Sequence, residues 1–323
     1  MSRLSAAVVF GLILACLSPW VAVAGEDFPT WLKGMRAEAR SQGISEATLD
    51  AAFKGVEPIG RVIELDRRQP EFTLTFKKYM ERVVNDRRVR IGKAKLAEHR
   101  ELLAEISRKY RVQPRFIVAL WGIETDFGRI TGGFPVIASL ATLAHDGRRS
   151  EFFRKELMLA LRIIDQGHIA AGDMKGSWAG AMGQNQFMPS SFHAYAVDHN
   201  GDGAKDIWGT LPDVFASIAN YLSKSGWRDD LTWGRPASIP AGFDPKMTGR
   251  KPMKRLSEWS ALGVRKADGS ALPTRDLEAS LISPEKKSLE PVFIAYHNYH
   301  VILRWNRSDY FAVAVGTLSD RLR

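Results

Sequence analysis

Cysteine is almost absent from this chain of 323 residues, since Cys16 is the only one. It lies in an N-terminal segment with the features of an export signal: a basic Arg3, a run of apolar and small residues over 6–17, and the small-x-small triplet Ala22-Val23-Ala24. We therefore predict that residues 1–24 are a signal peptide and that the protein is exported. Without that segment the chain can form no disulfide bond, so packing alone must stabilise it.

Long hydrophobic runs are also missing. A membrane-spanning helix needs about 20 apolar residues, whereas the run over 6–17 is shorter and is followed by Pro19. No other candidate follows Gly25, which favours an exported protein over an anchored one. One alternative stays open. Ile13-Leu14-Ala15 before Cys16 loosely resembles a lipoprotein box, and lipidation of Cys16 would associate the protein with the outer membrane.

Acidic residues are fewer than basic ones. The chain has 46 Lys and Arg against 36 Asp and Glu, a net charge of +10, and Arg3 is the only charge in the predicted signal peptide. Such an excess indicates an acidic partner. An exported protein rarely meets nucleic acid, so we expect no nucleic-acid partner and favour an anionic polymer of the cell envelope.

The seven histidines show no H-x-x-x-H or H-E-x-x-H spacing, which argues against a zinc hydrolase. We expect His199 to face solvent. The chain has no internal repeat, and its 45% hydrophobic content is enough for more than one buried core.

Hydrophobic periodicity predicts a mainly α-helical (α+β) fold. Proline disfavours helix in the residue before it, so Val112-Gln113-Pro114 marks a break between lobes. We expect helices at 72–85, 93–110, 149–166 and 212–225. The predicted division is a helical N-terminal lobe over 25–110 joined by 308–323, a catalytic core over 111–228, a small proline-rich and partly β lobe over 229–298, and a return to the core over 299–307.

Glu124 is the sharpest candidate for chemistry. It follows an apolar run and lies among Trp121, Ile123 and Phe127, where loss of solvation would favour the protonated carboxyl group. A protonated carboxylic acid can protonate the leaving oxygen of a glycosidic bond. On this segment alone, a structural glutamate in an ion pair is the commoner interpretation.

A second segment, residues 175–192 (KGSWAGAMGQNQFMPSSF), combines glycines with neutral polar side chains and aromatic rings. The glycines allow close backbone approach or positive φ. Neutral hydrogen-bonding groups beside aromatic faces suit a sugar, although an ordinary glycine-rich loop would have the same composition.

Together, GIETDFGR and the 175–192 segment resemble the membrane-bound lytic murein transglycosylase B family, of glycoside hydrolase family 103 type. The resemblance extends to LATLAHDGRRSEFFRKEL, DHNGDGAKDIWGTLPDVFASIANYL and NYHVILRWNRSDYFAVAVGTLSDRL, and is weakest over 229–290. It implies a lysozyme-like catalytic core, a periplasmic monomer, and peptidoglycan glycan strands as the substrate.

By this resemblance Glu124 is the only catalytic acid and base. It protonates the bond between N-acetylmuramic acid and N-acetylglucosamine, then deprotonates the muramoyl C6 hydroxyl, which attacks C1 and leaves a 1,6-anhydromuramoyl end. No cofactor is needed, and the substrate's own N-acetyl group stabilises the intermediate. Asp126 is not expected to serve as a second carboxylate, because residues two apart on a continuing helix do not face each other.

Two alternative functions stay open: a hydrolytic muramidase, and a cell-wall-binding protein that has lost activity. The retained Glu124 argues against the second.

The resemblance also implies substrate contacts. Arg148 and Arg149 would bind lactyl or peptide-stem carboxylates, although an Arg-Arg pair is by default a solvated one. Phe152 stands where the family has tyrosine, which puts a hydroxyl contact there in doubt. The remaining expected contacts are Ser177, Gln186 and Tyr221, with Asn298 and Asn306 as weaker candidates for the floor of the cleft.

The segment DHNGDGAKDIW begins like an EF-hand calcium loop. Asp198, Asn200 and Asp202 alternate, and Ala204 would supply its carbonyl group. The glutamate expected at the twelfth position is replaced by glycine. The resemblance implies that Asp213 takes that place, so the loop would span 198–213. We expect an optional structural Ca²⁺; a hydrogen-bonded turn without metal is the alternative.

Overall fold

The computed structural model describes residues 26–68, 74–285 and 288–323, so the predicted signal peptide and Cys16 lie outside the described residues. Within these ranges no helix is both long and apolar enough to cross a membrane. Most of the chain is helical, with α1 (Phe28–Ser41), α2 (Glu46–Phe53), α3 (Gly60–Arg68), α4 (Phe76–Val83), α5 (Asp86–Glu98), α6 (Arg100–Tyr110), α7 (Pro114–Thr125), α8 (Val136–His145), α9 (Ser150–Asp165), α10 (Pro189–Tyr195), α11 (Leu211–Lys224), α12 (Leu256–Ala261), α13 (His297–Trp305) and α14 (Asp309–Arg321).

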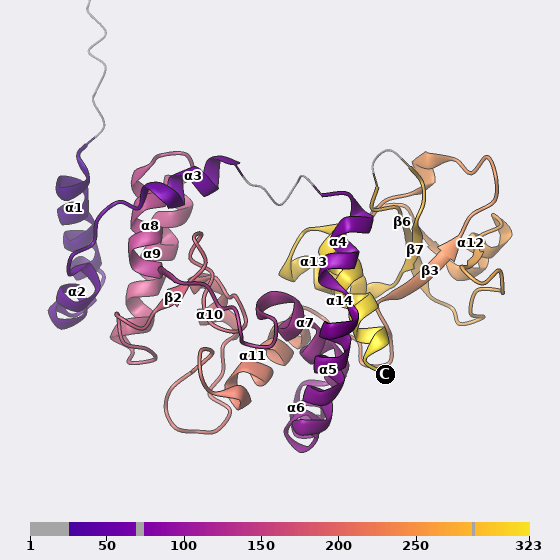
Figure 1. Cartoon of the computed structure of the whole chain (residues 1–323), viewed down its shortest axis with the longest axis horizontal. Helices are drawn as coiled ribbons and strands as arrows, with labels where there is room; N and C mark the ends of the chain where they lie inside the picture. The colour runs from indigo at the N-terminus through magenta and orange to yellow at the C-terminus, as the bar shows by residue number, and fades with distance from the viewer. Residues whose placement is uncertain (1–25, 69–73, 286–287) are drawn as a thin grey trace, which may run out of the picture.

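All of these helices except α12 contribute to two hydrophobic clusters. One cluster joins α1–α3 to α8–α10, and the other joins α4–α7 to α11, α13 and α14. Figure 1 shows α1 and α2 at one end of the molecule, beside α8 and α9, with α7, α10 and α11 near its middle. The predicted single lobe over 25–110 therefore needs correction. Its first three helices and its last three bury their apolar faces in different clusters, and α14 packs with α4 and α7.

The segment 229–298 contains a five-stranded antiparallel sheet of order β4-β6-β7-β3-β5. Its strands are β3 (Gly234–Ser238), β4 (Met253–Arg255), β5 (Arg265–Lys266), β6 (Glu278–Ile282) and β7 (Val292–Ala295). Strand β7 alternates between two environments, as the period of two requires. Phe293 and Ala295 pack against the helices, while Val292 and Ile294 enter a separate small core with Trp259. The sheet lies at the end of the molecule opposite α1 (Figure 1).

Helix α7 positions the predicted acid. It begins at Pro114, whose fixed φ suits the first helical turn, and it is buried through Leu120 and Trp121. It ends at Thr125, because Asp126 and Phe127 have positive φ values of 50° and 63°. Glu124 is therefore in the last turn, where α7 emerges from the core.

The predicted helix over 93–110 is interrupted. His99 ends α5 and precedes α6, with a φ of −106° and a ψ of 26°. The predicted helices over 149–166 and 212–225 are confirmed by α9 and α11, whose bounds differ from the prediction by one residue at each end.

Candidate active site

The side chain of Glu124 is half-buried and meets a residue from the far end of the chain. The indole N–H of Trp305, the last residue of α13, donates a hydrogen bond to Glu124 Oε1 at 2.6 Å. These residues are 181 positions apart in sequence. Trp305 is not among the candidate site residues predicted from the sequence, because nothing in the local pattern distinguishes it from other aromatic residues.

An aromatic cluster surrounds Trp305. Its ring lies 5.2 Å from the ring of Phe187 and 4.7 Å from that of Tyr221, measured between centroids. The ring of Tyr195 also contacts that of Tyr221, at 4.3 Å between centroids and tilted by 51°. Phe187 comes from the 175–192 segment and Tyr221 from α11, so the cluster joins three distant parts of the sequence beside the carboxyl group of Glu124.

Two hydrogen bonds tie α7 to the 175–192 segment. Trp121 donates its indole N–H to Gln184 Oε1 at 2.7 Å, and Thr125 donates its hydroxyl to the backbone oxygen of Gln184 at 3.0 Å. The Gln184 amide in turn donates to the backbone oxygen of Trp208 at 2.8 Å. Gln184 thus holds the Glu124 turn, the glycine-rich segment and the loop before α11 together.

The glycine-rich segment folds back on itself next to this connection. A Cβ atom on Gly176 would lie 2.1 Å from the carbonyl oxygen of Ala181, so only glycine fits. The Ser177 hydroxyl accepts a hydrogen bond from the Ala181 N–H at 3.0 Å. Gln186, with a φ of 49°, donates from its amide to the backbone oxygens of Thr131 and Gly183, both at 3.0 Å. Ser177 and Gln186, both predicted to bind substrate, therefore lie in one folded segment, and both residues are partly exposed.

Asp126 is held away from acid–base chemistry. Its buried carboxylate pairs with Arg87 at 2.9 Å, Arg129 at 2.7 Å and Arg88 at 3.4 Å. Burial alone would raise the pKa of Asp126, but the hydrogen bonds from Arg129 and Arg87 outweigh burial and lower it. Helix α7 does not continue through Asp126, so the expectation that Asp126 lies on the same helix as Glu124 is wrong. Asp126 nevertheless makes its ion pairs with these arginines and remains ionised.

Arg148 and Arg149 share one buried carboxylate. Asp66 of α3 is 1% exposed, and Arg148 donates to its backbone oxygen at 2.7 Å and to its Oδ2 at 3.1 Å. Arg149 pairs with the other carboxylate oxygen. Both arginine side chains remain 40–47% exposed. Asp66 was missed from the sequence, where an acidic residue in a charged helix suggests only a solvated face.

The other expected substrate contacts divide into two groups. Tyr221 donates its hydroxyl to the Arg304 carbonyl at 2.6 Å, and burial raises its pKa to about 12. Asn306 is exposed and directly follows Trp305. Asn298, in contrast, is fully buried and donates both amide hydrogens, to the carbonyls of Arg228 and Leu231 at 2.7 and 3.0 Å. Its amide holds a loop in place, so Asn298 does not lie on the floor of a cleft.

Backbone N–H groups of the 198–213 segment donate hydrogen bonds to its own aspartate side chains. Asp198 accepts from the N–H groups of Gly201 and Gly203 at 2.7 and 2.8 Å. The buried Asp213 reaches back to accept from His199 and Asp206 at 2.7 and 2.8 Å. In the part of the chain that the structure describes, no group of three or more His, Cys, Asp or Glu side chains is arranged to hold a metal ion. His199 was predicted to face solvent, which is wrong: its side chain is 5% exposed and lies 3.2 Å from Glu105.

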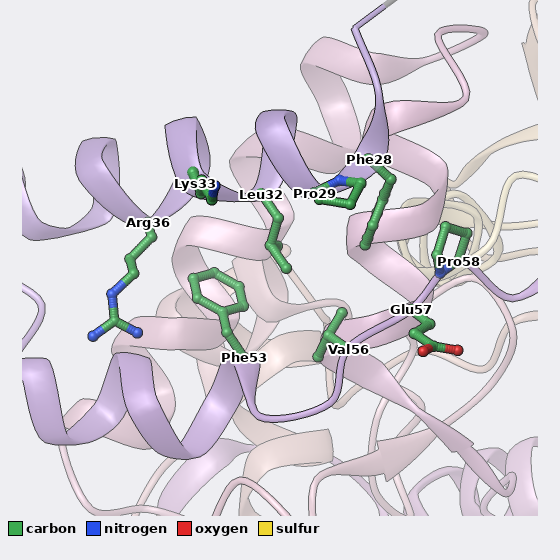
Figure 2. Close-up of a pocket in the computed structure, with 9 residues that line it drawn as sticks. All are labelled: Phe28, Pro29, Leu32, Lys33, Arg36, Phe53, Val56, Glu57 and Pro58. Atoms are coloured by element: carbon green, nitrogen blue, oxygen red, sulfur yellow. The ribbon is translucent and has the colours of Figure 1, made fainter.

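A cavity of about 570 Å³ lies elsewhere, between α1 and α2. Figure 2 shows Leu32 of α1 facing Phe53 and Val56, with Lys33 and Arg36 at the side. None of the predicted site residues lines this cavity. It is therefore separate from the chemistry at Glu124.

The helical scaffold, with one half-buried carboxyl group at the end of a core helix, is of the lysozyme-like class. The family model described as "Transglycosylase SLT domain" matches residues 27–320, and the chain belongs to this family. The resemblance inferred from the sequence motifs is thereby confirmed.

Relatives of known structure extend over most of the chain. SltB3 from Pseudomonas aeruginosa, in complex with NAG-anhNAM-pentapeptide, is 44% identical with a TM-score of 0.88, covering 92% of this chain and 80% of that one. Escherichia coli Slt35, in complex with calcium, is 27% identical with a TM-score of 0.79, covering 92% and 95%. Membrane-bound lytic murein transglycosylase B of E. coli K12 is 31% identical over 253 residues, which are 75% of this chain and 66% of that relative's length.

Proposed function

We propose that this protein is a lytic murein transglycosylase that cleaves the MurNAc–GlcNAc bond of peptidoglycan and forms 1,6-anhydromuramoyl ends. The observation that carries the proposal is the single carboxyl group of Glu124, held at its Oε1 by Trp305 at 2.6 Å. The family assignment over residues 27–320 supports the same activity. The anhydro-sugar peptide bound by the P. aeruginosa relative is the product that such a reaction would leave.

Glu124 would act twice in this reaction. Its carboxylic acid gives a proton to the GlcNAc O4 as the bond from C1 to O4 breaks. The resulting carboxylate then takes the proton of the muramoyl C6 hydroxyl as that oxygen bonds to C1. The proton count balances and no water is consumed. Asp126 takes no part, because Arg87, Arg88 and Arg129 hold its charge.

The groups proposed to bind the glycan and its stem peptide lie on several elements. Ser177 and Gln186 belong to the folded 175–192 segment, the ring of Tyr221 contacts that of Trp305, and Asn306 follows Trp305 directly. Arg148 and Arg149 each keep exposed surface beyond Asp66, so a guanidinium group can also bind a substrate carboxylate.

The site of action follows from the substrate. We propose that the protein works in the periplasm after export, because the predicted signal peptide and the peptidoglycan substrate both point there. Lipidation at Cys16 and a monomeric state stay predictions.

A structural Ca²⁺ in the 198–213 loop is also proposed, as an ion that takes no part in the reaction. The carboxylates of Asp198, Asp202 and Asp213 form no ion pair with Lys or Arg within the described ranges, and they accept hydrogen bonds from backbone N–H groups of the loop. Asn200 and the carbonyl of Ala204 would complete the set. The side chains now accept backbone N–H bonds and would have to turn toward the ion. The calcium-bound E. coli relative supports the proposal.

The direct test of the activity uses purified peptidoglycan. Incubation with the mature protein should release soluble muropeptides and clear the suspension. If the folded protein releases nothing above a buffer control, the proposed function is wrong.

A further inference from the structure

We infer that Trp305 is a positioning residue for Glu124, which decides which carboxyl oxygen carries the catalytic proton. The inference rests on the proposed function and adds a residue to its machinery. An indole N–H can donate a hydrogen bond but cannot accept one. The bond from Trp305 therefore requires Glu124 Oε1 to be an acceptor in both protonation states.

In the neutral acid this requirement places the proton on Oε2, because the carbonyl oxygen is the better acceptor. Oε2 then delivers the proton to the leaving O4 while C1–O4 breaks. In the return step Oε2 receives the C6 hydroxyl proton while the bond from the C6 oxygen to C1 forms. Trp305 stays on Oε1 throughout, so the carboxyl group need not rotate between the two steps.

The surroundings make Trp305 a rigid donor. Its ring packs against Phe187 and Tyr221, and it contacts both of the large hydrophobic clusters. The preceding residue, Arg304, is fixed on two sides: its carbonyl accepts from Tyr221 at 2.6 Å, and its guanidinium donates to the Ser225 carbonyl at 3.0 Å. The end of α13 is thus tied to α11, and the indole N–H is held in one direction.

The kinetic test replaces the donor and keeps an aromatic ring. W305F should lower kcat by about 10- to 100-fold, the size of effect that misplacing a catalytic group by about 1 Å produces. KM should change by less than about twofold, because binding groups elsewhere are intact. W305H keeps a ring N–H at a similar distance from the backbone and should recover part of kcat.

The matched control is W259F. Trp259 donates its indole N–H to the Ala279 carbonyl at 2.9 Å in the small core beneath the sheet, so the same group is lost far from Glu124. Its kcat should equal that of the wild type. An unchanged kcat for W305F in an active protein would overturn the positioning role and leave the proposed function standing.

A spectroscopic readout tests the contact without activity. In protein labelled with ¹⁵N-tryptophan, the indole resonance that disappears in W305F should shift in E124Q, whereas the resonance assigned through W259F should not. If the chemical shift of the Trp305 indole is the same in E124Q as in the wild type, the inference is overturned. If the wild type cleaves no peptidoglycan, the proposed function fails and the role of Trp305 fails with it.

Discussion

Trp121 donates its indole N–H to Oε1 of Gln184 at 2.7 Å, and both side chains are buried. Trp121 lies one turn before Glu124 on α7, while Gln184 belongs to the glycine-rich segment that carries Ser177 and Gln186. The bond therefore connects the helix that presents the acid to the segment proposed to bind the sugar. The amide of Gln184 extends the connection to the carbonyl of Trp208, which belongs to the 198–213 loop.

Gln184→Met should destabilise the fold. The substitution keeps the length of the side chain but leaves the Trp121 N–H and the Trp208 carbonyl without these partners. Each unsatisfied buried polar group costs about 1–3 kcal/mol, so the free energy of unfolding should fall by about 2–6 kcal/mol in urea titrations. Gln42→Met is the control, because Gln42 is exposed and its side-chain amide donates to the carboxylate of Glu38. Equal stability of the two variants would contradict the connecting role of Gln184.

Glu124→Gln should abolish cleavage and retain the fold. The amide has a similar shape to the acid and can still accept from Trp305, but it cannot donate a catalytic proton. Loss of general acid–base catalysis costs about 10²- to 10⁴-fold in rate. The measurement is the rate of muropeptide release, with unfolding curves as evidence of folding. A folded E124Q protein with near wild-type activity would show that another group is the acid.

The cluster around Asp126 should make stability depend on acidity. Because its pKa is lowered in the folded state, the stability that Asp126 contributes is present above the unfolded value of about 3.9 and is lost as the pH falls through the folded pKa. Hydrogen bonds to charged groups contribute about 1.5–3 kcal/mol. At pH 7, Asp126→Asn should therefore be less stable than the wild type by about 1–3 kcal/mol, and this difference should shrink below about pH 4.

Urea unfolding at a series of pH values measures that difference. Asp50→Asn is the matched control, since Asp50 is 72% exposed and pairs with Arg36 at 2.6 Å. An exposed pair contributes about 0–1 kcal/mol, so this variant should follow the wild type at every pH. If Asp126→Asn is also as stable as the wild type at every pH, the ion pairs of Asp126 with the arginines do not stabilise the fold.

Calcium at millimolar concentration should raise the melting temperature of the protein. An ion that binds only the folded state stabilises it by RT ln(1 + [L]/Kd), which is about 1.4 kcal/mol at ten times Kd. The double variant D198A/D202A should lose the rise, whereas D244A/D268A, which removes two exposed aspartates from other turns, should keep it. Absence of any calcium-dependent rise in the wild type would leave the 198–213 loop as a plain hydrogen-bonded turn.

The sequence predicts local features of this fold better than contacts between distant residues. The helices α9 and α11 have clear amphipathic periods, so their bounds follow within one residue. The interruption at His99 was missed, and so was the division of α1–α6 between two clusters, which depends on the surfaces that later helices offer.

The candidate site shows the same limit. Glu124 could be selected only because GIETDFGR and the 175–192 segment together resemble a known family, since the apolar run before it fits a structural glutamate equally well. Trp305 and Asp66 could not, because their partners lie 181 and 82–83 positions away and only tertiary packing brings them together. Asn298 was wrongly predicted to lie on the cleft floor. The sequence around an asparagine does not show whether its amide faces a cleft or, as here, binds the backbone of a buried loop.

The products of peptidoglycan digestion test the proposed reaction most directly. A muramoyl C6 hydroxyl tethered to the reacting sugar has a high effective concentration and can outcompete water. We expect muropeptides lighter than hydrolytic ones by one water, with no new reducing ends, so that borohydride leaves their muramoyl termini unchanged. Fully hydrated masses with stoichiometric borohydride reduction would identify a muramidase and contradict the account.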